Sequence, residues 1–144
     1  YRLKKRVLGA AANLSANEKF KSEFMSAMQD DLNTSKALAA VDEFVRSAND
    51  ELDANPKDKA KKGEIAANLE LIARVLGILQ VDVFEYFQFG VSDEKRAYIE
   101  DLIIQRNEAK AAKNYELSDK IRDMLAANGI SLMDTPEGCM WEKI

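Results

Sequence analysis

Apolar side chains in this chain recur at helical spacing over most of its length, and few residues interrupt them. Within residues 16–54 and 63–79 they stand three or four positions apart, which places them on one face of a helix. Only 6 Gly and 2 Pro occur among the 144 residues, too few for the turns that many short strands need. We therefore predict a mainly α protein whose apolar faces meet in an antiparallel helical bundle.

Capping residues and breaks divide this pattern into separate helices. Ser15 and Glu18 stand in the register of a capping box, and the residue before Pro56 disfavours helical backbone. Asn33 or Thr34 is placed to cap the helix over 34–54, Ser92 to cap the helix over 93–113 and Asn114 to cap the helix over 115–128. The charged stretch 57–62 can open a fourth helix or remain a loop. We expect helices over residues 1–12, 16–28, 34–54, 63–79, 93–113 and 115–128.

The last third of the chain has a different organisation. Gly90 followed by Ser92 marks a boundary, and two short apolar runs flank Thr135-Pro136-Glu137-Gly138 in the manner of a β-hairpin. Residues 81–89 are aromatic and β-branched, which predicts a short helical turn or an irregular connector. We predict a helical bundle over residues 1–90 and a small helix-helix-β-hairpin module over residues 91–144.

The residue types that are missing exclude most self-contained chemistry. The chain has no His, and its single Cys, Cys139, allows neither an internal disulfide nor a zinc site. No Gly-rich phosphate loop occurs. We therefore expect no catalytic residues, no metal and no cofactor in this chain, and binding is the favoured function.

Three features of the sequence bear on where the chain acts. Its apolar runs are far shorter than a membrane span, and no charged-then-apolar leader stands at the front. A single Cys is compatible with a reducing compartment. The chain begins at Tyr1 in helix-compatible sequence, so we expect a piece of something longer.

The overall charge does not indicate nucleic-acid binding, because the chain has 21 basic and 25 acidic residues. A local basic strip does occur where the apolar face of the helix over 93–113 continues into Arg106, Lys110 and Lys113. Such cations can complement the helix dipole and lie over the core, or they can contact a phosphate backbone. Spacing alone favours the first interpretation.

A second face lies on the helix over 115–128. Tyr115, Asp119 and Arg122 stand on the side opposite its apolar residues. They can form an exposed Tyr beside an ordinary ion pair, or a stacking surface with a hydrogen-bond acceptor and a cation, as proteins use to read single-stranded RNA. Spacing alone again favours the structural interpretation.

Two stretches of the sequence resemble cysteinyl-tRNA synthetases. The first is Met28-Gln-Asp-Asp-Leu-Asn-Thr34 followed by Ala37-Leu38. The second is a tail pattern of short elements in the same order as in that family. These elements are Arg106, Glu-Ala-Lys110, Lys113-Asn-Tyr115, Ser118-Asp119, Ile121-Arg122-Asp123, Gly129-Ile130, Leu132, Asp134-Thr-Pro-Glu-Gly138 and Trp141. The resemblance covers essentially the whole chain, as the C-terminal portion of such an enzyme.

This resemblance implies one part of a divided class I enzyme. The family joins cysteine to its tRNA with ATP, on a Rossmann-like domain whose zinc ion selects the thiol. Its His-Ile-Gly-His and Lys-Met-Ser-Lys-Ser signatures and its zinc ligands have no counterpart here. ATP and zinc are thus implied only for the missing catalytic domain. Residues 1–90 would support the anticodon stem, and residues 91–144 would recognise the anticodon.

The resemblance also implies a set of site residues, and it reverses the preference on the Tyr115 face. Lys110, Tyr115, Asp119 and Asp134 match the anticodon-reading positions. Tyr115 would stack on a base, the two carboxylates would accept from base amino and imino groups, and Lys110 would contact phosphate or a base edge. Arg106, Lys113 and Arg122 are the further candidates for contacts with the tRNA backbone.

The resemblance leaves one rival function, and a plain structural bundle that binds neither RNA nor a helical partner is a third possibility. The partner that the resemblance implies is cysteine-specific tRNA, bound through its anticodon stem-loop, with the chain a cytoplasmic monomer that has no membrane partner. The rival is a helical-hairpin module for protein–protein interaction, because the helices over 93–113 and 115–128 also resemble the short hairpin of excision-repair subunits. That alternative leaves the Asp134–Trp141 hairpin without a role.

Overall fold

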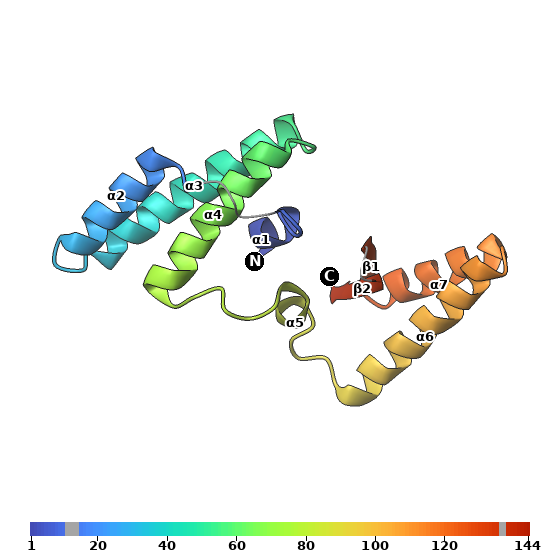
Figure 1. Cartoon of the computed structure of the whole chain (residues 1–144). Helices are drawn as coiled ribbons and strands as arrows, with labels where there is room; N and C mark the ends of the chain where they lie inside the picture. The colour runs from blue at the N-terminus through green and yellow to red at the C-terminus, as the bar shows by residue number, and fades with distance from the viewer. Residues whose placement is uncertain (11–14, 136–137) are drawn as a thin grey trace. The chain divides into compact units, whose positions relative to one another are not determined.

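The computed structural model describes residues 1–10, 15–135 and 138–144. Contacts divide the chain into two compact units, Tyr1–Gln80 and Val81–Ile144 (Figure 1). The predicted fold class is confirmed, since the described residues are mainly helical and end in a two-stranded antiparallel hairpin. None of the helices in the described ranges combines the length and the apolar content that crossing a bilayer requires.

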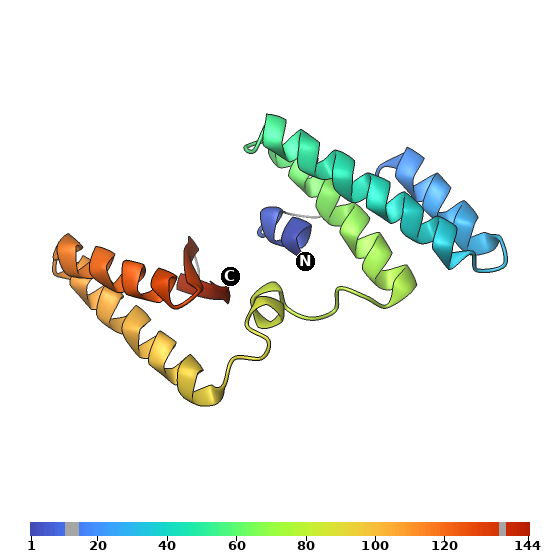
Figure 2. The same ribbon diagram turned by 180° about the vertical axis from the view of Figure 1, so that it is seen from behind.

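The first unit is built on three long helices with a short one packed against them. Both ribbon views place α2, α3 and α4 side by side (Figures 1 and 2). Short turns join them, so that each runs antiparallel to the next. The helices of this unit are α1 (Arg2–Arg6), α2 (Glu18–Gln29), α3 (Thr34–Ala54) and α4 (Lys59–Leu76).

Side-chain caps define where these helices begin. The Asn33 side chain accepts from the Lys36 N–H at 3.1 Å and begins α3 as predicted. The predicted capping box at Ser15 is wrong, because Asn17 caps α2 by accepting from the Phe20 N–H at 3.1 Å. Asp58 caps α4, so most of the charged stretch belongs to the helix.

The first helix is shorter than predicted. It ends at Arg6, and Gly9 adopts φ 74, which α-helical backbone excludes. Residues 11 and 12 of the predicted helix lie outside the described residues. The Arg6 guanidinium fastens this short helix to α3, donating to the Asn49 and Asp53 side chains at 2.7 and 2.6 Å.

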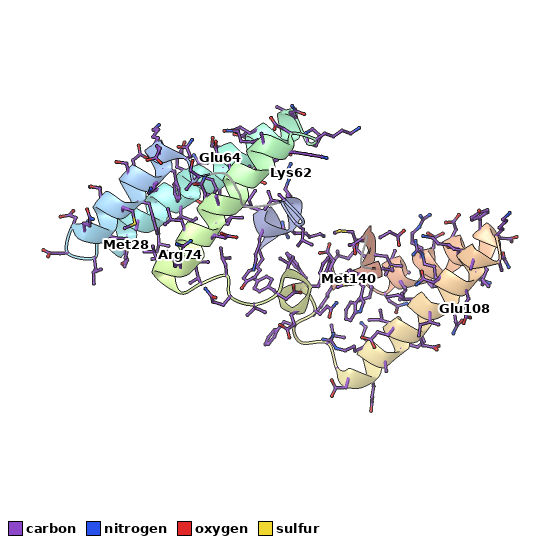
Figure 3. All side chains as sticks on the ribbon, viewed as in Figure 1. Met28, Lys62, Glu64, Arg74, Glu108 and Met140 are labelled. Atoms are coloured by element: carbon purple, nitrogen blue, oxygen red, sulfur yellow. The ribbon has the colours of Figure 1, made fainter. Side chains whose placement is uncertain are left out.

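Aromatic side chains fill the centre of the first unit. Phe24 is fully buried, and its ring stacks on that of Phe20 with centroids 5.5 Å apart. The ring of Phe20 also meets that of Phe44 on α3 at 4.7 Å, which joins two helices. Met28, near the end of α2, packs against this core from its edge (Figure 3).

The second unit places a helical hairpin beside a β-hairpin. Its elements are α5 (Val83–Phe87), α6 (Asp93–Ala111), α7 (Tyr115–Ala127), β1 (Ile130–Thr135) and β2 (Gly138–Lys143). Ser92 and Asn114 cap α6 and α7 as predicted. The strands pair Leu132 with Trp141 and Asp134 with Cys139. The core is formed by Ile99, Leu102, Ile103, Ile121, Leu125, Ile130 and Trp141.

The contact boundary falls after Gln80, earlier than the domain boundary that we expected after residue 90. The aromatic connector accounts for the difference, because its helix α5 packs against β2. Gln88, at the end of α5, is buried and donates from Nε2 to the Trp141 carbonyl at 2.9 Å. The division of tasks between residues 1–90 and 91–144 stays a prediction.

Candidate nucleic-acid interface

One face of α6 changes from apolar to basic along its length. Ile99 and Ile103 are buried in the core, and Arg106 and Lys110 follow at helical spacing on the same side. The β-hairpin meets this end of the face through Asp134 of β1, which contacts both cations. The burial of the two cations differs, since the Arg106 side chain is 5% exposed and that of Lys110 is 39% exposed.

The carboxylate of Asp134 lies at the centre of this basic strip. Arg106 donates to it from two nitrogens, with Nη1 3.0 Å from Oδ1 and Nη2 3.2 Å from Oδ2. Lys110 Nζ lies 2.8 Å from the same Oδ2. Because the two cations come from α6 and the carboxylate from β1, this cluster also fixes the hairpin to the helix.

These contacts set the charge of the cluster. Hydrogen bonds from Arg106 and then Lys110 hold the pKa of Asp134 far below its ordinary value. The hydrogen bond to Asp134 raises the pKa of Arg106 in return. Burial raises the pKa of the neighbouring Cys139 thiol, which keeps it protonated. The site therefore presents an ionised carboxylate held between two basic side chains.

The lowered pKa of Asp134 predicts how acid affects the second unit. A carboxylate with a lower pKa in the folded state stabilises the fold above its ordinary pKa of 3.8. That contribution is lost as the pH falls through the folded pKa. We expect Asp134→Asn to lower the free energy of unfolding near neutral pH, and the difference from wild type should shrink as the pH drops below about 4. Urea unfolding across this range measures it. A constant difference would contradict the prediction, and Asp123→Asn, an exposed carboxylate on α7, serves as control.

The second predicted face lies at the start of α7. Tyr115 is the first residue of this helix and is 63% exposed. One turn further, Asp119 pairs with Arg122 at 3.0 Å, and both side chains remain more than half exposed. The Asp119 charge also contributes to the raised pKa of Arg106, which links the α7 face to the α6 cluster electrostatically.

The turn between α6 and α7 places Lys113 beside this face. Lys113 adopts φ 59, a left-handed conformation that is uncommon for a residue with a side chain. Its backbone N–H donates to the Lys110 carbonyl at 3.0 Å, and the Asn114 side chain then caps α7. Lys113 is exposed and stands two residues before Tyr115 in the chain.

The predicted site residues are therefore distributed over two neighbouring elements and a hairpin. Lys110 and Asp134 are in direct contact, and Asp119 and Arg122 form a separate pair. Arg106 differs from its prediction, because a guanidinium that is buried and held by Asp134 presents almost no surface to an RNA phosphate. Its apolar neighbours at helical spacing were the signal for this inward position.

Two contacts of this unit have no signal in the sequence. Cys139 contacts Arg106, with Sγ 3.5 Å from Nη1, because it pairs with Asp134 across the strands. Arg96 donates to the Gln88 side chain and lies over the Trp141 ring, 5.3 Å from its centroid. Only the register of the β-hairpin brings Cys139 to Arg106. No apolar periodicity predicts that Gln88 is buried. No three Cys, Asp or Glu side chains in the described ranges are grouped so that they could hold a metal ion.

The helices of the first unit match a known family of domains. Residues 23–80 match the family model of the DALR domain. The match begins within α2, includes α3 and α4, and ends at the last residue of the first unit. This part of the chain thus has the class of fold that the bundle pattern predicted, although the literal Asp-Ala-Leu-Arg tetrad does not occur in it.

Over its whole length, the chain is similar to part of the cysteine–tRNA ligases. It is 58% identical over 143 residues to that of Campylobacter concisus, covering 99% of this chain and 31% of the relative. It is 58% identical over 142 residues to that of Campylobacter hominis, covering 99% and 30%. It is 51% identical over 144 residues to that of Aliarcobacter butzleri, covering 100% and 31%. The chain therefore spans about a third of the length of these relatives and matches their C-terminal region. The resemblance inferred from the tail motif is confirmed.

Proposed function

We propose that this chain binds cysteine-specific tRNA and reads its anticodon, as the C-terminal part of a cysteine–tRNA ligase. The single observation that carries the proposal is the arrangement around Asp134. It offers a fixed, ionised acceptor on the surface of the second unit, in a chain whose whole length is similar to those ligases. Single-stranded RNA is recognised through such acceptors together with aromatic stacking.

Each exposed group of the second unit takes one task in this function. Tyr115 stacks on an unpaired anticodon base, because more than half of its surface is exposed. Asp134 and Asp119 accept from the amino and imino groups of the bases. Lys110, Lys113 and Arg122 contact phosphates, and Arg106 acts only through Asp134.

The ligation itself belongs to the part of the enzyme outside this chain. With no His and one Cys, the residues here do not fit a zinc site, and ATP and zinc are assigned to the catalytic domain of the parent enzyme. Anticodon binding contributes by orienting the distant acceptor end of the tRNA. A net charge of −4 limits nonspecific attraction to phosphate, so that base contacts decide affinity. We further propose that the enzyme is a cytoplasmic monomer.

Titration against short anticodon stem-loops at controlled salt tests this function. One loop carries the cysteine anticodon GCA, and the other carries a single change at its first base. We expect the wild-type chain to prefer GCA. Tyr115→Ala should weaken that binding by roughly 5–150-fold, since stacking of one base on an aromatic ring contributes about 1–3 kcal/mol.

Two controls separate recognition from general effects of mutation. Tyr98→Ala removes an exposed Tyr of α6 that lies far from the cluster along the helix, and it should bind as the wild type does. Tyr115→Trp keeps an aromatic surface and should retain the preference. Equal binding of both loops by the wild-type chain would contradict anticodon recognition. Indifference to RNA together with binding to a helical protein would favour the interaction module instead.

A further inference from the structure

The carboxylate of Asp134 has few acceptor positions left. An ionised carboxylate offers about four lone pairs, two on each oxygen. Arg106 uses one on Oδ1 and one on Oδ2, and Lys110 uses the second on Oδ2. A hydrogen bond between the Cys139 thiol and Asp134 also contributes to the raised pKa of that thiol. A base that donates to Oδ2 must therefore displace Arg106 or Lys110.

The base edge that matters most needs an acceptor on each oxygen. The imino and amino groups of guanine, the first base of GCA, point the same way and donate in parallel to the two oxygens of one carboxylate. Oδ2 accepts from both cations, so this pair of hydrogen bonds requires that one cation leaves Oδ2. Loss of the Cys139 thiol from Asp134 would not free a position on Oδ2, because the two cations occupy both positions of that oxygen.

Burial decides which cation can leave. Arg106 is 5% exposed, donates two hydrogen bonds in a fixed fork and is packed beneath the hairpin. Lys110 is 39% exposed, makes one contact with Asp134 and ends a flexible stem of four carbons. Displacing Arg106 would leave a buried cation unpaired, whereas the Lys110 ammonium can move to another anion at the surface.

We infer that Lys110 is an exchangeable, specificity-determining cation, which occupies an acceptor position of Asp134 in the unbound chain and transfers to an RNA phosphate when a base donates to Asp134. Arg106 remains in place as the positioning residue that holds the carboxylate in register. The inference rests on the proposed function, and it adds which group moves. It also predicts that Asp134 discriminates against RNA loops with other bases. Only an RNA that supplies both a donating base edge and a phosphate offsets the loss of the Lys110–Asp134 ion pair.

A double-mutant cycle in the 144-residue chain tests the exchange. The variants are Lys110→Met, Asp134→Asn and both together, titrated with the GCA stem-loop at low salt. If Lys110 transfers, Lys110→Met should cost less than about threefold in the wild-type background, because the lost phosphate contact is offset by an ion pair that no longer has to break. In the Asp134→Asn background nothing offsets the loss, and the cost should rise to roughly fivefold or more, the upper range for an exposed ion pair.

A static Lys110 gives the opposite order. If the ammonium stays on Asp134 in the complex, Lys110→Met should weaken binding more in the wild-type background than beside Asn at position 134. That order, or equal losses in the two backgrounds, would overturn the exchange while leaving the anticodon preference of the wild type intact. An absence of GCA preference in the wild type would overturn both proposals.

The salt dependence of binding supplies a second readout. A new contact with a phosphate of a single strand steepens the fall of log affinity with log salt by about 0.7. Lys110→Met should therefore reduce that slope by about this amount. Lys95→Met, an exposed lysine in the first turns of the same helix, should leave the slope unchanged. In a Cys139→Ala chain, the difference between the two losses of affinity caused by Lys110→Met should be unchanged. If that difference disappears, the Cys139 thiol is the group that leaves Asp134.

Discussion

Trp141→Ala is expected to lower the free energy of unfolding of the second unit by about 3–5 kcal/mol, the usual cost of truncating a buried Trp. The Trp141 side chain is 4% exposed and is the largest member of the core between α6, α7 and the hairpin. Arg96 also loses the ring over which its guanidinium lies. Urea unfolding followed by backbone amide NMR signals of residues in α6 and α7 measures the change.

The neighbouring strand residue provides the matched comparison for this prediction. Met140 precedes Trp141 on β2, points to the other side of the strand and is half-buried. Met140→Ala should cost clearly less, and Trp141→Phe should recover part of the loss. The same cost for Met140→Ala would mean that the hairpin is not anchored through Trp141. Binding of the GCA loop should decrease together with stability, because Asp134 is held on the partner strand.

Phe24→Ala is expected to cost the first unit about 3–5 kcal/mol and to leave the second unit folded. Phe24 is fully buried on α2, and its removal eliminates the stacking contact with Phe20. Trp141 is the only Trp of the chain, so its fluorescence reports the second unit alone. Circular dichroism should reveal an early loss of helix in urea, while the fluorescence midpoint should stay at the wild-type value.

Truncation of an exposed apolar residue in the same bundle is the control for truncation of the buried Phe24 side chain. Leu38 on α3 is 52% exposed, and Leu38→Ala should change the stability by less than about 0.5 kcal/mol. If the fluorescence midpoint of Phe24→Ala moves together with the dichroism, the two units unfold as one. That result would contradict independent unfolding of the two units, which we expect because each unit has its own hydrophobic core.

Most of the helical architecture could be predicted from local signals. Asn33, Ser92 and Asn114 each cap the helix that the sequence assigned to them, because a cap depends on residues within one turn. The capping box at Ser15 failed because Asn17 competes for the same helix end. Asn17 also donates its backbone N–H to the buried Asn68 side chain on α4, a tertiary contact that no local pattern contains.

The candidate site was predictable in its members and not in their arrangement. Tyr115 and the Asp119–Arg122 pair lie on an exposed face of α7, as helical spacing requires. The tail motif supplied Asp134 through its resemblance to a family. Spacing placed Arg106 and Lys110 on one strip that continues the apolar face of the helix, yet the structure separates them, with one buried and the other partly exposed.

The sequence by itself thus determined the helices and the hairpin, since periodicity, caps and turn residues act over a few positions. The proposed ligand came from the resemblance of the tail motif to a family. Only the tertiary structure decided how the cations are used. The pairing of β1 with β2 sets Asp134 opposite Cys139, and the packing of that hairpin on α6 brings the carboxylate to Arg106 and Lys110. These contacts join positions that are 24 and 28 residues apart in the chain, and their energy depends on burial, which a linear pattern does not specify.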